Sequence, residues 1–120
     1  MADKNLIAEK SMDFAVRCVN LYKYLSQDKN EYIMSKQVYR SGTSVGANIV
    51  EAEMAISKRE FLSKMYIAFK ECCETEYWLE LLHETRYVED TPFVALMSKC
   101  KELKKMLSSI TKSSKESLEK

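Results

Sequence analysis

Apolar residues recur at steps of three and four along four stretches of the chain, which is the period of an amphipathic α-helix. Polar breaks at residues 27–30, around 57 and at 89–92 separate these stretches. The pattern predicts helices over about residues 4–26, 31–55, 58–87 and 92–111, followed by a frayed polar tail over 112–120. Because the breaks are short, consecutive helices should pack side by side and antiparallel. The expected fold is one all-α domain over residues 1–120, an up-down-up-down antiparallel four-helix bundle.

Residues that favour helix N-termini stand at the start of every predicted helix, and they are Asp3, Asn30, Ser57 and Thr91. At the fourth start, Pro92 takes the first helical position, where a missing N–H is tolerated. The third start carries the clearest pattern, because Glu60 completes a capping box with Ser57. Ile56 and Phe61 also have the spacing of a hydrophobic staple across that start.

The second predicted helix carries a polar stripe beside its packing face, within the stretch YRSGTSVGANIVEAEM at residues 39–54. At about 100° per residue, one arc of this helix collects a packing face of Met34, Val38, Ser41, Gly42, Val45, Ile49, Ala52 and Ile56. The neighbouring arc collects Arg40, Ser44, Asn48 and Glu51. Gly42, with Gly46 at its margin, should let a neighbouring backbone approach closely, at about 1 kcal/mol each in helix propensity.

Carboxylates on the third predicted helix are the expected partners of this stripe. Glu71 and Glu74 share one side of that helix, and a contact of Arg40 and Asn48 with Glu74 would form a half-buried network that sets helix register. The predicted structural network therefore comprises Arg40, Ser44, Asn48, Glu51, Glu71 and Glu74. A binding surface made of the same residues is the alternative. Catalysis would need a nucleophile, a metal set or an acid–base pair, and no catalytic residue is assigned.

Composition narrows the function classes further. One proline and two glycines in 120 residues leave few helix breakers, and a formal net charge of +1 gives no overall field toward nucleic acid. The N-terminal residues MADKNLIAEK lack the apolar run of a signal peptide, and no stretch approaches the roughly 18 apolar residues of a membrane span, so we expect a cytoplasmic protein without membrane association. We expect reduced core thiols at Cys18, Cys72, Cys73 and Cys100, which lack metal-binding spacing. The single histidine, His83, should be a core or interface residue. We expect no metal, cofactor or small-molecule substrate.

Two surfaces remain as candidates for binding. The third predicted helix has an apolar arc of roughly 160°, wider than one bundle seam needs, which predicts self-association. This arc contains Phe61, Leu62, Met65, Tyr66, Ala68, Phe69, Cys72 and Cys73. The fourth predicted helix concentrates lysines, and the candidate nucleic-acid face is Lys99, Lys101, Lys104 and Lys105. The alternative is a solvated lysine face interleaved with Glu102 and Glu116.

The block Arg40-Ser41-Gly42-Thr43-Ser44-Val45-Gly46-Ala47-Asn48-Ile49, followed by Glu51-Ala52, Ser57, Phe61, residues 68–74 and Trp78-Leu79, carries a family resemblance. Over roughly residues 5–110 the chain resembles the small four-helix bundle proteins encoded in intervening sequences of bacterial 23S ribosomal RNA genes. The resemblance implies a bacterial, cytosolic, non-enzymatic bundle that assembles as a ring, typically a pentamer. A related bundle is the accessory protein of diversity-generating retroelements, which engages nucleic acid together with a reverse transcriptase.

These observations favour a non-enzymatic oligomeric interaction module that serves as an RNA- or DNA-associated accessory protein. The alternative is a structural scaffold that binds another protein and has no nucleic-acid role. Either function would use the surfaces of the bundle rather than a catalytic pocket.

Overall fold

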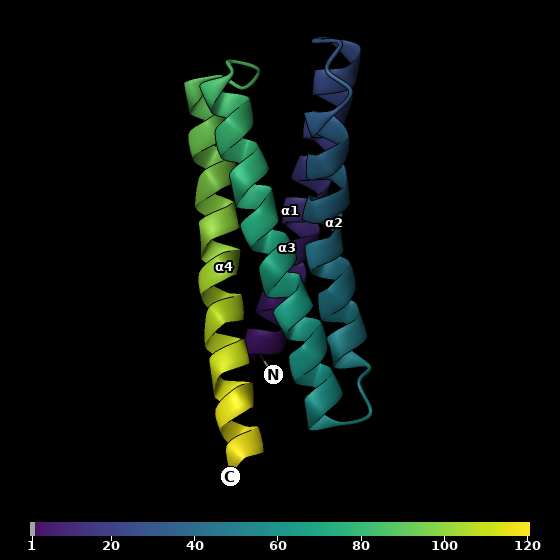
Figure 1. The fold of residues 1–120 in the computed structure, drawn as a ribbon, viewed down its shortest axis with the longest axis vertical. Helices are drawn as coiled ribbons and strands as arrows, with labels where there is room; N and C mark the ends of the chain where they lie inside the picture. Colours follow the sequence, from purple (N-terminus) through teal and green to yellow (C-terminus); the bar gives the residue numbers. More distant parts are fainter. Residues whose placement is uncertain (1) are drawn as a thin grey trace.

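The computed structural model describes residues 2–120, with side chains from Leu6 onward. It contains the helices α1 (Ala2–Gln27), α2 (Met34–Glu53), α3 (Lys58–Glu84) and α4 (Asp90–Glu119). They alternate in direction and form a rod of 50 × 22 × 21 Å (Figure 1). Each helix packs against the next one in the chain, and α4 closes the bundle against α1. The predicted all-α antiparallel four-helix bundle is confirmed.

The core runs along the axis of the bundle and is built from the inward arcs of all four helices. Its largest fully buried apolar side chains are Ile7, Phe14, Leu25, Val38, Val45, Ile49, Met65, Leu79, Leu82, Leu103 and Leu107. Each such side chain contributes roughly 1.5–3 kcal/mol on leaving water. Helical periodicity explains this core, because the buried residues along each helix, such as Phe14, Cys18, Leu21 and Leu25 on α1, recur at three- and four-residue steps.

All four cysteines are free thiols, as the sequence indicated, and Cys18, Cys72 and Cys100 belong to this core, whereas Cys73, also expected there, is only partly buried. The sulfur atoms of Cys72 and Cys100 lie 3.9 Å apart across the α3–α4 seam. Burial, with a smaller contribution from the neighbouring Cys72, raises the pKa of the Cys18 thiol to about 12. Cys18 is therefore protonated at neutral pH and behaves as a small apolar side chain.

Close contact between α1 and α2 depends on Gly42. A Cβ atom at this position would lie 2.4 Å from Cys18 Sγ and 2.8 Å from Cys18 Cβ. At Gly46 the same atom would lie 3.3 Å from Ser11 Oγ, which is a tight contact but not a clash. The predicted close approach is thus confirmed at Gly42, and it is milder at Gly46.

The start of α2 differs from the prediction. Asn30 does not cap the helix; it adopts the left-handed region, with φ of 54°, in the turn after α1. The carboxylate of Glu31 instead accepts hydrogen bonds from the backbone N–H groups of Ile33, Met34 and Ser35, at 3.1, 3.0 and 2.7 Å. These are orphan donors of the first turn, so one carboxylate satisfies several of them at once.

The α2–α3 connection confirms one prediction and corrects another. Ser57 caps α3, with Glu60 N donating to its hydroxyl at 3.0 Å, but no bond from Ser57 N to the Glu60 carboxylate completes the predicted capping box among the described residues. However, α2 ends at Glu53, and Ile56 is 93% exposed in the connection. Ile56 is therefore absent from the packing face and cannot form the predicted staple with Phe61. The helix stops before the apolar pattern does, so the last apolar residue falls outside it.

The ends of α3 and α4 also differ from the prediction. α3 stops at Glu84 rather than 87, and Arg86 adopts a left-handed φ of 69° in the turn that follows. α4 begins at Asp90, so the predicted cap at Thr91 lies inside the helix and Pro92 is its third residue rather than its first. It continues to Glu119, and residues 112–120 are not a frayed tail: Lys58 Nζ donates to Ser117 Oγ at 3.4 Å, beside the start of α3. The cap predicted at Asp3 rests on a side chain outside those described.

The wide apolar arc of α3 is largely used within the bundle. Met65, Ala68 and Cys72 are buried, and of the remaining members only Tyr66 is exposed. α3 packs against both α2 and α4, so it needs a wider apolar arc than a helix with a single seam. The arc therefore gives less support to self-association than its width in the sequence implied.

Candidate functional site

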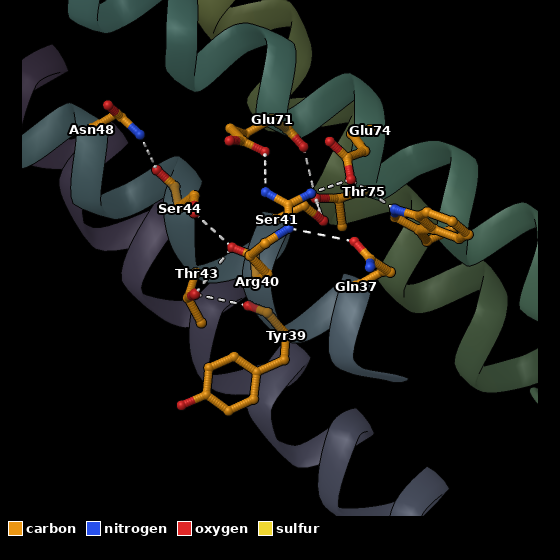
Figure 2. Close-up of polar contacts among 11 residues, drawn as sticks. Gln37, Tyr39, Arg40, Ser41, Thr43, Ser44, Asn48, Glu71, Glu74 and Thr75 are labelled. Atoms are coloured by element: carbon orange, nitrogen blue, oxygen red, sulfur yellow. Dashed lines mark hydrogen bonds and ion pairs between the residues drawn. The ribbon is translucent and has the colours of Figure 1, made fainter. Parts of the chain in front are cut away.

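Arg40 is the centre of a polar cluster between α2 and α3 (Figure 2). Its Nη1 lies 3.4 Å from Glu71 Oε1, and its Nη2 bonds directly to Glu74 Oε2. The indole N–H of Trp78 donates to the same Glu74 oxygen at 2.9 Å. Glu71, Glu74 and Trp78 follow one another at steps of three and four, so α3 presents them together on the flank that faces α2.

Hydrogen bonds at this cluster favour the charged forms of Glu74 and Arg40. The Trp78 indole and the Arg40 guanidinium together hold the pKa of the Glu74 carboxyl below its usual value, although partial burial opposes them. The bond from Glu74 correspondingly raises the pKa of Arg40. Both side chains are partly exposed to solvent, so the ion pair contributes about 1 kcal/mol or less. The cluster orients helices more than it stabilises them.

The other members of the predicted network do not join this cluster. Asn48 Nδ2 donates to the backbone oxygen of Ser44 at 2.9 Å, and Ser44 Oγ donates to the backbone oxygen of Arg40 at 2.6 Å. Figure 2 shows Asn48 turned back along its own helix. Glu51 pairs instead with Lys64 Nζ at 2.8 Å. Arg40 thus meets both expected carboxylates, whereas Asn48, about 12 Å further along α2, does not reach Glu74.

A buried hydroxyl pair beside the cluster was not recognised from the sequence. Thr75 Oγ1 lies 2.8 Å from Ser41 Oγ and 2.8 Å from the backbone oxygen of Glu71, and both hydroxyl-bearing residues are fully buried. A hydroxyl has one proton, so Thr75 donates to the carbonyl and accepts from Ser41. The position of Ser41 on the packing face was the available signal, since a buried hydroxyl needs a partner.

The four lysines predicted as one face are divided between two sides of α4. Lys99 pairs with Asp13 of α1 at 3.3 Å, and Lys104 pairs with Glu76 of α3 at 2.8 Å. Lys101 and Lys105 are exposed and form no ion pair with any residue from 6 to 120. Lys99 lies at least about 120° around the helix from the other three, which share an arc of about 100°. Only Lys101 and Lys105 therefore offer unneutralised charge together.

His83 lies at the junction of α3 and α4 rather than in the core. Its ring stacks on Phe93 with centroids 3.9 Å apart, and its Nε2 lies 2.7 Å from Asp90 Oδ1. These contacts tie the end of α3 to the first turn of α4. No hydroxyl or thiol nucleophile bonds to this imidazole among the described side chains, so nothing here positively indicates enzymatic chemistry.

The described part of the chain contains neither a metal-ligand cluster nor a membrane-spanning helix. Across these residues no three His, Cys, Asp or Glu side chains gather closely enough to hold a metal ion. None of the helices between residues 2 and 120 has an apolar stretch long enough to cross a membrane.

Comparison with known proteins identifies relatives of the chain. A family model described as 23S rRNA-intervening sequence protein matches residues 3–109. A search of curated protein sequences finds no match. Among solved structures, the chain is similar to a protein of unknown function from the S23 ribosomal protein family of Bacteroides thetaiotaomicron, with 50% identity and a TM-score of 0.90. That match covers 92% of this chain and 98% of the other.

Proposed function

The chain belongs to the family of 23S rRNA-intervening sequence proteins, and we propose that it is a non-enzymatic, oligomeric interaction module that associates with RNA or DNA as an accessory protein. The bundle offers exposed surfaces of two kinds, one apolar and one basic. The apolar surface supports self-association, and the basic surface supports binding to phosphates. In this proposal the protein acts in the cytoplasm.

Exposed apolar side chains on α1 and α2 are the observation that carries this proposal. Met12 and Val16 lie one turn apart on the side of α1 opposite the core, and Tyr39 and Val50 lie on the flank of α2 beside α1. These four residues, the α1–α2 apolar face, are between 43% and 65% exposed. A second copy covering them would remove apolar surface from water, which favours association. The family resemblance implies a closed ring, typically a pentamer, in which the α1–α2 apolar face of every copy would be covered.

We expect the protein to form an oligomer in solution and Val16→Glu to dissociate it, because a carboxylate on the α1–α2 apolar face would be buried without a partner. Light scattering at micromolar concentration measures the mass directly, and a pentamer has five times the 14.0 kDa mass of the chain. Val94→Glu is the matched control, since Val94 is an exposed valine on α4 outside this face. A wild-type mass of one chain across the concentration range would contradict self-association.

We expect the oligomer to bind structured RNA or duplex DNA at low salt, with an affinity that falls steeply as salt rises. Each subunit adds Lys101 and Lys105, and their phosphate contacts release condensed counterions. Replacing both by glutamine should flatten the log–log salt slope by roughly one unit per lost contact. Fluorescence anisotropy at two salt concentrations measures this slope. Lys99→Gln is the control, because Lys99 is already paired with Asp13.

The alternative function is a structural scaffold for another protein. One observation favours it: Lys99 and Lys104 are neutralised within the bundle by Asp13 and Glu76, so half of the predicted lysine face is not free. Absence of nucleic-acid binding at low salt by the intact oligomer would reject the accessory role and favour the scaffold.

A further inference from the structure

We propose that a groove between α3 and α4 binds an unpaired base and the adjoining phosphates of a single-stranded nucleic acid. This inference rests on the proposed association with nucleic acid and assigns it a specific site. The groove, of about 650 Å³, lies between the first half of α3 and the last third of α4. It is separate from the Arg40 cluster and from the α1–α2 apolar face.

The groove has an aromatic and apolar floor on α3. Leu62, Tyr66 and Phe69 follow one another at steps of four and three, so they line one flank of the helix. Opposite them α4 contributes Ser108 and Thr111, whose small side chains leave the space between the helices open. The rings of Tyr66 and Phe69 are nearly parallel, with centroids 6.1 Å apart and an interplanar angle of 21°. Tyr66 is the exposed member, and its ring offers a stacking surface to a base.

Positive charge surrounds this floor. Arg59, Lys112 and Lys115 line the groove, and no acidic side chain does. Within residues 6–120 none of these three forms an ion pair, in contrast to Lys99 and Lys104. These three cations are therefore not already neutralised by ion pairs within the described residues. Lys70 Nζ lies over the Tyr66 ring, 5.9 Å from its centroid, and adds a further cation at the floor.

Charge complementarity favours a nucleotide strand over an apolar protein segment as the occupant of the groove. An apolar helix laid into the groove would desolvate three cations without supplying partners, which is unfavourable. A nucleotide strand supplies a flat base that can stack on the aromatic floor and phosphates that can pair with Arg59, Lys112 and Lys115. Bases within a duplex are already stacked and paired, so only an unpaired base can turn its face to Tyr66. The groove should therefore prefer single strands to duplexes.

The test compares an oligouridylate with a duplex of equal length, using fluorescence anisotropy and the intact protein. We expect Tyr66→Ala to weaken single-strand binding roughly tenfold and to change duplex binding little, because stacking on the ring is lost. Its salt slope should stay unchanged, since no phosphate contact is removed. Lys112→Gln combined with Lys115→Gln should instead lower the single-strand slope by roughly 1.4 units.

Tyr77→Ala is the matched control for Tyr66→Ala. Both tyrosines are on α3 and similarly exposed, at 57% and 52%, but Tyr77 is outside the groove. If the wild type binds single strands and both tyrosine variants bind equally well, the groove proposal is overturned while the accessory role stands. Equal weakening of single-strand and duplex binding by Tyr66→Ala would also overturn it. If the wild type binds neither probe at low salt, the accessory role fails and the groove proposal with it.

Discussion

Replacing Gly42 by alanine is expected to lower the free energy of unfolding by about 3 kcal/mol, the upper part of the range for overpacking a core. Without a clash, alanine would stabilise the helix by up to about 1 kcal/mol relative to glycine. A loss of stability would therefore show that α1 packs closely against Gly42. The added Cβ would meet Cys18 Sγ at 2.4 Å and Cys18 Cβ at 2.8 Å. The thiol can change rotamer, but Cys18 Cβ moves only if α1 moves. Urea denaturation followed by circular dichroism measures the change.

Gly46→Ala is the matched control, because it makes the same chemical change one turn further along α2. The new Cβ would contact Ser11 Oγ at 3.3 Å, and a small rotation of that hydroxyl relieves it. We expect a stability within about 0.5 kcal/mol of the wild type, as the gain in helix propensity offsets the tighter contact. Combining Gly42→Ala with Cys18→Ala should recover part of the loss. Equal stability of the two glycine variants would show that α1 and α2 are not in close contact at Gly42.

Replacing Glu31 by glutamine is expected to destabilise the protein by about 2 kcal/mol at pH 7, and the difference should shrink in acid. Burial of Glu31 favours its protonated form, but three backbone N–H bonds outweigh burial and lower the pKa of its carboxyl. A lowered folded-state pKa means that the stabilisation is fully present above the unfolded glutamate pKa of about 4.3. It is lost as the pH falls through the lower folded-state value.

Denaturation by urea at several pH values between 7 and 3 measures this dependence. Glu53→Gln provides the control, because Glu53 is exposed at the other end of α2 and makes no side-chain hydrogen bond among the described residues. The free energy of unfolding of Glu53→Gln should differ little from that of the wild type at every pH. A Glu31→Gln difference that did not change with pH would mean that the carboxylate charge is not what caps α2.

Local rules explain why part of the candidate site could be predicted. Arg40 and Ser44 are four residues apart, so helical geometry puts them on one stripe whatever the rest of the chain does. The same rule places Glu71 and Glu74 on one side of α3. That these carboxylates meet Arg40 depends in addition on the axial register of α2 against α3, which tertiary packing sets. The cap at Ser57 was predictable for a similar reason, since it depends on residues three apart.

Caps and helix ends were less predictable where two local choices compete. Asparagine is a favoured N-cap residue, yet it also tolerates the left-handed backbone that Asn30 adopts here. Once Asn30 turns the chain, the longer side chain of Glu31 reaches the first turn of α2. The C-terminal end of α4 was also hard to predict, because its residues after Thr111 are polar and yet remain helical beside the start of α3. Intrinsic helix propensities distinguish only weakly between these alternative helix ends.

The four helices, their antiparallel order, the core faces and the glycine contact follow from the amino-acid sequence, because each depends on residues a few positions apart or on adjacent elements. Which charges meet depends on how the helices pack. Two helices can slide along one another by a turn without changing either apolar face, so axial register is invisible in one sequence. Register determines that Arg40 reaches Glu74 while Asn48 does not, and that Glu76 neutralises Lys104. It also places Lys112 opposite the exposed ring of Tyr66, which creates the basic aromatic groove.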